Sequence, residues 1–175
     1  MTKQATREIT IREADLRGGK LRGVDLTGVD LRGQNLSGAD LRGANLRGVG
    51  AVDAVLRCAD LRGAKLRGAN FSGADLTGAN LEDALLCDAN LSGADLSGAN
   101  LTGAYMHGAN LIGANLTGAD LKRADLRAAD LRGADLIGAN LTCANLFGAR
   151  LGNTSLRAAQ GISADTLAAR LDVRF

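Results

Sequence analysis

The sequence repeats every five residues over almost its whole length. From position 11 to position 156 there are 30 positions in steps of five, and Leu fills 26 of them. Asp or Asn fills 21 of the 30 positions just before, and Gly fills 20 of the 30 positions two residues after. Ala is the commonest residue two positions before each Leu. The register never slips, which is typical of a repeat array.

A five-residue period fits neither a helix nor a flat strand. In a helix the step turns the chain by about 140°, which scatters the leucines around the axis. In a straight strand an odd step sends successive leucines to opposite faces. Within one pentad, however, Ala and Leu are two residues apart and share a face. The pattern therefore predicts short extended segments joined by bends, wrapped around their own leucines as a solenoid.

The bend falls at the Gly position of each pentad. Glu13, Cys58, Arg123, Ala128 and Cys143 also occupy that position, and each carries a Cβ that disfavours positive φ. We therefore expect a bend in which Gly is favoured but a left-handed conformation is not obligatory.

Irregular residues indicate how many pentads make one coil. Ala51 replaces a central Leu, and Phe71, the largest central residue, follows 20 residues later. The outward-facing Leu85 and Tyr105 are also 20 apart. Four pentads per coil would place the members of each pair side by side.

Segments such as "ADLRGANL", "ANLTGADL" and "ADLSGANL" resemble the A(D/N)LXX motif of the pentapeptide repeat proteins. The resemblance implies an all-β fold, a right-handed quadrilateral parallel β-helix of about 7.5 coils over residues 10–160. Residues 1–9 are then a lead-in or cap.

Residues 161–175 break the period and predict a short C-terminal α-helix, with Ser163 as its N-cap. Its apolar side is expected to cover the last coil or to form a homodimer contact. Family members similar in outline often dimerise through this end. The residues expected in this cap or dimer contact are Ile162, Leu167, Leu171 and Phe175.

Catalytic and metal-binding patterns are missing from the sequence. There is one His, and the three cysteines form no CxxC pair. The Asp and Asn residues occupy a structural position, where they are expected to bond neighbouring backbone or to stack as in Asn70, Asn90 and Asn110. We therefore expect no enzyme and no cofactor. Without an apolar leader or a membrane-spanning run, we expect a cytoplasmic protein.

Basic and acidic residues are unevenly distributed along the chain. Residues 1–68 hold 13 Lys or Arg and 8 Asp or Glu, whereas residues 69–121 hold six acids and no Lys or Arg. The candidate acidic surface comprises Asp75, Glu82, Asp83, Asp88, Asp95 and Asp120. Arg22, Arg42 and Arg62 form a candidate basic surface, which is either solvated and ion-paired or a site for an anionic partner. Direct nucleic-acid binding is not expected, because aromatic stacking partners are missing.

Unusual residues also gather on one side of the predicted rod. They occupy positions where the pattern expects polar groups, and they are Leu85, Cys87, Tyr105, His107 and Phe147. They are either sequence variation at surface positions that tolerate many residue types, or a contact surface for a protein.

Two functions are consistent with these observations. The first is a non-catalytic rigid scaffold for protein–protein interaction. The second is implied by the resemblance, because some pentapeptide repeat proteins mimic DNA, bind DNA gyrase or topoisomerase IV, and protect it from quinolones or toxins. The acidic segment fits this second role, but the positive net charge of +2 does not.

Overall fold

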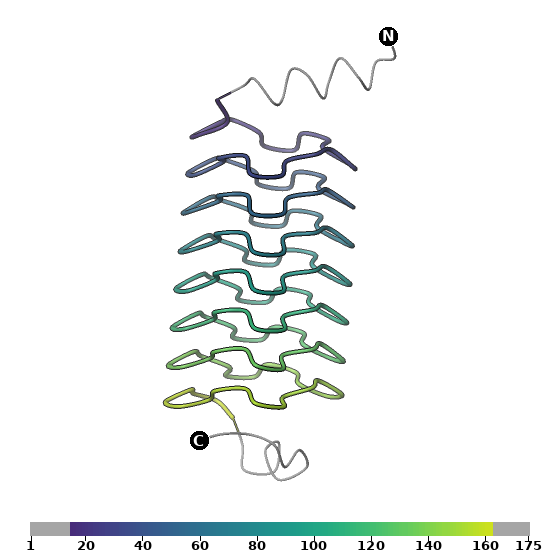
Figure 1. The fold of residues 1–175 in the computed structure, drawn as a ribbon. Coiled ribbons are helices and arrows are strands. Elements are labelled where there is room, and N and C mark those ends of the chain that lie inside the picture. The colour runs from purple at the N-terminus through teal and green to yellow at the C-terminus, as the bar shows by residue number, and fades with distance from the viewer. Residues whose placement is uncertain (1–14, 163–175) are drawn as a thin grey trace.

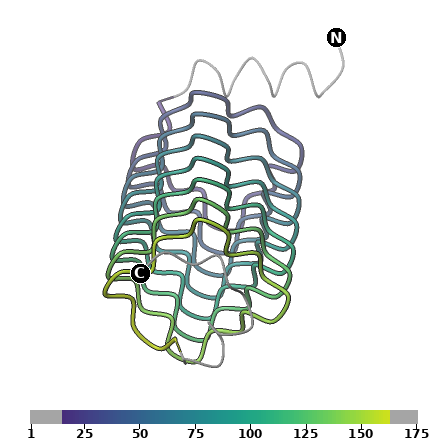
Figure 2. The same ribbon diagram turned by 60° about the horizontal axis from the view of Figure 1, so that its bottom comes forward.

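The computed structural model describes residues 15–162 as a rod of stacked coils. Figure 1 shows the coils stacked along one axis, from purple at the N-terminal end to yellow at the C-terminal end. In Figure 2, tilted toward the C-terminal end, each coil lies over the next with little offset. Within residues 15–162 there is no helix and no continuous strand; each pentad contributes a single parallel β-bridge residue.

Every bridge joins residues 20 apart, so four pentads complete one coil. Leu85 pairs with Tyr105, and Gly50 pairs with Asn70, so Ala51 and Phe71 lie in neighbouring coils. Both pairings confirm the four-sided coil inferred from the irregular residues. The total of about 7.5 coils stays a prediction, because the expected first coil begins before residue 15.

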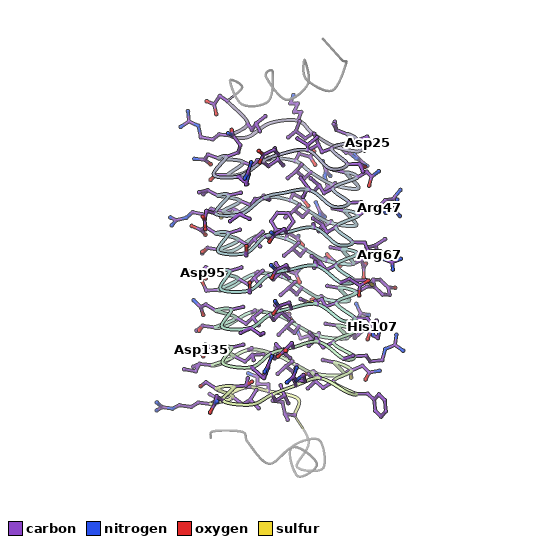
Figure 3. All side chains as sticks on the ribbon, turned by 45° about the vertical axis from the view of Figure 1, so that its right-hand side comes forward. Asp25, Arg47, Arg67, Asp95, His107 and Asp135 are labelled. Carbon is purple, nitrogen blue, oxygen red and sulfur yellow. The ribbon has the colours of Figure 1, made fainter. Side chains whose placement is uncertain are left out.

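We number the four sides by their bridge residues, which recur every 20 positions. Counting every twentieth position, side 1 runs from 20 to 160 and side 2 from 25 to 145. In the same way, side 3 runs from 30 to 150 and side 4 from 35 to 155. Because the chain visits the sides in that order, side 2 lies opposite side 4. Figure 3 shows this, with Arg47, Arg67 and His107 on one edge of the rod and Asp95 and Asp135 on the other.

The interior is a continuous column of leucines and alanines. From Leu36 to Leu141 every central residue of a pentad is at most 2% exposed, including Phe71 and Met106. Such dense, dry packing stabilises the rod through apolar burial, since few other residues could fill a core of this width.

The five backbone N–H groups of a regular pentad all find acceptors. In pentad 96–100, two donate to the following coil and one to the preceding coil, at 2.7 to 3.0 Å. The Ala99 N–H donates to the carbonyl of Leu96 at 3.0 Å, which closes a turn. The Ser97 N–H donates to Asp95 Oδ1 at 2.9 Å. The Asp or Asn before each Leu thus satisfies the one N–H that neither the turn nor the ladder can use.

The bend proved to be left-handed at every described pentad, contrary to our expectation. The third residue has positive φ throughout, from 53° at Cys58 to 74° at Gly148. Together with the Leu carbonyl accepting from three residues on, this defines a type II turn, which requires positive φ at that position. Residues with a Cβ, such as Arg123 and Ala128, adopt the same conformation at an energetic cost, because the ladder bonds on both sides hold it.

This conformation leads to a stability prediction with opposite signs at two corners. Gly98 has φ of 63° and no atom within 4 Å of an added Cβ, so Gly98→Ala should lose only the conformational cost, about 1–2 kcal/mol. Ala128→Gly should raise the free energy of unfolding by up to about 1 kcal/mol, because it removes that cost. Urea denaturation of both variants measures the effects. A gain at Gly98→Ala, or a loss at Ala128→Gly, would contradict the left-handed corner.

The C-terminal residues are described only in part. Ile162 is partly buried and packs against the core of the rod. Leu167, Leu171, Phe175 and the expected helix lie outside the described residues, as do residues 1–9. The helix and the choice between cap and dimer contact stay predictions.

Candidate protein-contact surface

The apolar strip lies on side 2 and consists of Leu85, Cys87, Tyr105 and His107. The Leu85 and Tyr105 backbones form a β-bridge, so these side chains are direct neighbours along the rod. Tyr105 is 48% exposed, whereas the Met106 beside it is completely buried. The sequence YMH therefore keeps the core intact and changes only the surface.

Cys87 and His107 occupy the adjacent column of the same side. The Cys87 thiol donates to the backbone carbonyl of Tyr105 at 3.7 Å, which ties the two coils together. The His107 side chain is exposed (Figure 3). All four members of the strip thus lie together as the sequence predicted.

Phe147 shares this column but is separated from the strip. It is 80% exposed, the largest exposed fraction among the large apolar side chains of the described residues. The coil between His107 and Phe147 contributes Arg127, whose guanidinium donates to both carboxylate oxygens of Asp125 at 2.7 Å. The sequence placed Phe147 on the correct side, but this ion pair divides the expected surface in two.

Cations flank the strip at both ends. Arg47, Lys65 and Arg67 precede it on side 2, and Arg127 follows it. Arg67 lies 3.4 Å from Asp88, while Arg47 and Lys65 form no ion pair with another described residue. These two cations lie at the N-terminal end of the strip, where they complement acidic groups on a partner, whereas Arg127 is paired with Asp125.

The candidate acidic residues do not share one side of the rod. Asp75 and Asp95 lie on side 4, and Asp88 lies at a corner of side 2. Asp120 is a bridge residue of side 1, and Glu82 and Asp83 lie in the corner after that side. Half of them are ion-paired. The pairs join Asp75 to Arg57, Asp88 to Arg67 at 3.4 Å and Asp120 to Lys122 at 3.1 Å.

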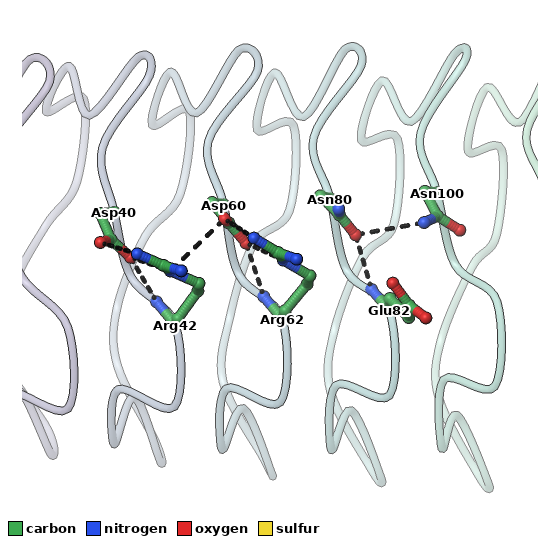
Figure 4. A network of polar contacts seen from close by, with 7 residues as sticks. All are labelled: Asp40, Arg42, Asp60, Arg62, Asn80, Glu82 and Asn100. Atoms are coloured by element: carbon green, nitrogen blue, oxygen red, sulfur yellow. Dashed lines mark hydrogen bonds and ion pairs between the residues drawn. The ribbon is translucent and has the colours of Figure 1, made fainter.

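The candidate basic residues do share one side. Arg22, Arg42 and Arg62 follow successive bridge residues of side 1 and line a common hollow. The Arg42 guanidinium donates to both carboxylate oxygens of Asp40, at 2.7 and 2.6 Å (Figure 4). This hydrogen bonding is the main cause that lowers the pKa of Asp40 to about 2, so the carboxylate stays charged at neutral pH.

Within residues 15–162, the same Arg–Asp clamp recurs wherever Arg stands two residues after Asp. It forms at Arg17, Arg32, Arg42, Arg62, Arg127 and Arg132. The ion-paired alternative that we gave for the candidate basic surface is thus found at Arg42 and Arg62, but the recurring tripeptide Asp-Leu-Arg as the general signal for the clamp was missed. The Asn ladder was predicted correctly: Asn90 Nδ2 donates to Asn70 Oδ1 at 3.1 Å, and Asn110 Nδ2 to Asn90 Oδ1 at 3.2 Å.

Two kinds of feature are absent from residues 15–162. That part of the chain holds no group of three or more His, Cys, Asp or Glu placed to bind a metal ion. It also holds no helix of the length and apolarity needed to cross a bilayer.

The stacked pentads with 20-residue pairing define a quadrilateral parallel β-helix, which is right-handed in the family that the next comparison identifies. Residues 11–48, 54–93, 79–118, 89–127 and 119–157 match the family model described as pentapeptide repeats, in 8 copies. The chain belongs to the pentapeptide repeat family.

Similar solved structures come from the same family. HetL from the cyanobacterium Nostoc sp. strain PCC 7120, a protein involved in heterocyst differentiation regulation, is 31% identical over 90% of this chain and 91% of its own, with a TM-score of 0.34. Another Nostoc PCC 7120 pentapeptide repeat protein is 43% identical over 57% of this chain and 84% of its own, with a TM-score of 0.48.

The fluoroquinolone resistance protein QnrB1, which is plasmid-mediated, is 22% identical over 83% of this chain and 73% of its own, with a TM-score of 0.44. No curated protein matches the chain significantly.

Proposed function

We propose that this protein is a non-catalytic rigid scaffold that binds a protein partner through side 2. The observation that carries this proposal is the apolar strip, in which the half-buried Leu85 and the exposed Tyr105 stand side by side in neighbouring coils. An exposed Tyr beside an apolar neighbour is typical of the centre of a protein interface. The rod holds the strip in a fixed geometry, so that binding costs little ordering of the scaffold.

The flanking charges describe the partner. Arg47 and Lys65 at one end of the strip favour a partner surface with an apolar centre and acidic groups facing that end. Association should then slow as the salt concentration rises, because these exposed charges steer the encounter.

Loss of the strip should weaken partner binding. The double variant Leu85→Asn and Tyr105→Asn restores the Asn of regular pentads, so the ladder should form unchanged and binding should fall at least about tenfold. Affinity capture from the native cell extract, with the variant and the wild-type rod as baits, measures the effect. The matched control, Thr77→Asn with Ser97→Asn, changes side 4 and should retain the partner. Equal capture by the strip variant and the wild-type protein would rule out the strip as the contact.

DNA mimicry ranks behind this proposal. The segment 69–121 with its six acids and no Lys or Arg favours an anionic surface. However, those carboxylates are divided among three sides, and Asp75, Asp88 and Asp120 are each paired with a cation. Binding to a type II topoisomerase stays a prediction, which a gyrase supercoiling assay with and without a quinolone can test.

A further inference from the structure

A second surface, on side 1, has the composition of an anion site. A hollow of about 300 Å³ lies near the N-terminal end of the described rod, lined by Arg22, Arg42, Gly43 and Arg62. The three arginines come from three successive coils, so the ladder fixes their spacing at about 4.8 Å.

Two of these arginines are already held in place. Arg62 Nε and Nη2 donate to Asp60 at 2.9 and 2.6 Å, as Arg42 does to Asp40 (Figure 4). Arg42 Nε also lies 3.5 Å from Asp60 Oδ2, which links the two clamps along the side. A ligand that uses the remaining N–H donors would therefore meet side chains whose conformational entropy is already lost.

Arg22 differs from the other two because its own pentad lacks the carboxylate. In six pentads an Asp two residues before the Arg forms the clamp, but here the residue is Lys20. Among residues 15–162, no carboxylate oxygen lies within 4 Å of the Arg22 guanidinium. Its five donors remain available at the edge of the hollow.

The charges around the hollow do not cancel. Lys20, Arg22, Arg42 and Arg62 contribute four positive charges along this side, and Asp40, Asp60 and Glu82 contribute three negative ones. The side thus keeps an excess of positive charge at the hollow, which favours an anion. Arginine forks suit the oxygens of a tetrahedral phosphate, because they donate two parallel hydrogen bonds.

We propose that the hollow of Arg22, Arg42 and Arg62 binds a phosphate dianion, either free or carried as a monoester by a small molecule. Arg22 is the principal donor, and the clamped Arg42 and Arg62 supply a preorganised wall. The site is independent of the protein contact proposed for side 2.

Arginine Nε–Hε signals in a ¹H–¹⁵N NMR titration can test this site at constant ionic strength. The probes are inorganic phosphate and O-phosphoserine, with chloride as the reference anion. The signals of Arg22, Arg42 and Arg62 should shift together and saturate, while those of Arg127 and Arg132 should not. Tighter binding of O-phosphoserine assigns the site to phosphate monoesters, and tighter binding of inorganic phosphate assigns it to the free ion.

Two variants and one control separate the site from general charge attraction. Lys20→Asp recreates the Asp-Leu-Arg clamp, which should occupy Arg22 and weaken phosphate binding roughly tenfold or more without harming the fold. Arg22→Gln should have a similar effect. Arg132→Gln removes one charge from side 3 and should leave the affinity unchanged. Equal phosphate affinity in wild-type and Lys20→Asp proteins, or equal shifts of all arginines, would overturn the proposal.

Discussion

Leu96→Ala is expected to lower the free energy of unfolding by about 2–5 kcal/mol, the range for a fully buried Leu. Leu96 is completely buried in the middle of the rod, with Leu76 and Leu116 in the coils before and after it. A cavity there cannot be filled by relaxation, because the ladder bonds on both sides hold the coils at a fixed separation. In a solenoid each coil is stabilised only by its neighbours, so a central defect weakens both halves.

Urea denaturation monitored by circular dichroism measures this loss, and Leu21→Ala is its control. Leu21 is only partly buried and lies in the first described coil. Its replacement should cost clearly less than that of Leu96, because a smaller apolar area returns to water. Equal losses at the two positions would contradict a core whose stability comes from coil stacking.

Ala51 and Phe71 are expected to be energetically coupled. Both are buried central residues of side 3, and the Gly50–Asn70 bridge places them in adjacent coils. Phe71→Leu should leave unfilled space beside Ala51, and Ala51→Leu should overpack against Phe71, each costing about 1–3 kcal/mol. The double variant restores the regular Leu–Leu stack, so it should be nearly as stable as the wild-type protein.

A double-mutant cycle measures this coupling directly. The predicted interaction free energy is of the order of 1–3 kcal/mol, the range for residues in contact. The matched control pairs Ala51→Leu with a substitution at Leu111, two coils beyond Phe71, where the effects should add. Additive losses in the Ala51 and Phe71 cycle would show that the large residue does not compensate for the small one.

The sequence predicted the coil because its exceptions were informative. A perfect pentad repeat is compatible with several coil lengths. The irregular residues are more specific, because Ala51 and Phe71 are separated by 20 positions and so are Leu85 and Tyr105. Packing complementarity between neighbours thus appears in the residues that depart from the consensus. The same argument placed the apolar strip on one side before any coordinates were known.

The corner conformation was misjudged for a physical reason. We took Cβ-bearing residues such as Arg123 and Ala128 to argue against positive φ, but local preference is weaker than the ladder bonds that fix each corner. Ion pairs between coils, such as Arg150 with Asp130 at 3.3 Å, could be predicted only once the coil length was known. The division of the contact surface by Arg127 could have been predicted, because Arg127 lies one coil after His107 and completes a tripeptide Asp-Leu-Arg.

Site-specific photo-crosslinking in the native cell tests most directly whether side 2 is the contact surface. In one variant of the protein, benzoyl-phenylalanine replaces Tyr105. In a second variant, it replaces Ser97 on the opposite side 4. We predict that the group at position 105 crosslinks to a protein partner and that the group at position 97 does not. Equal crosslinking from both positions, or crosslinking from position 97 alone, would contradict a scaffold that binds through the apolar strip.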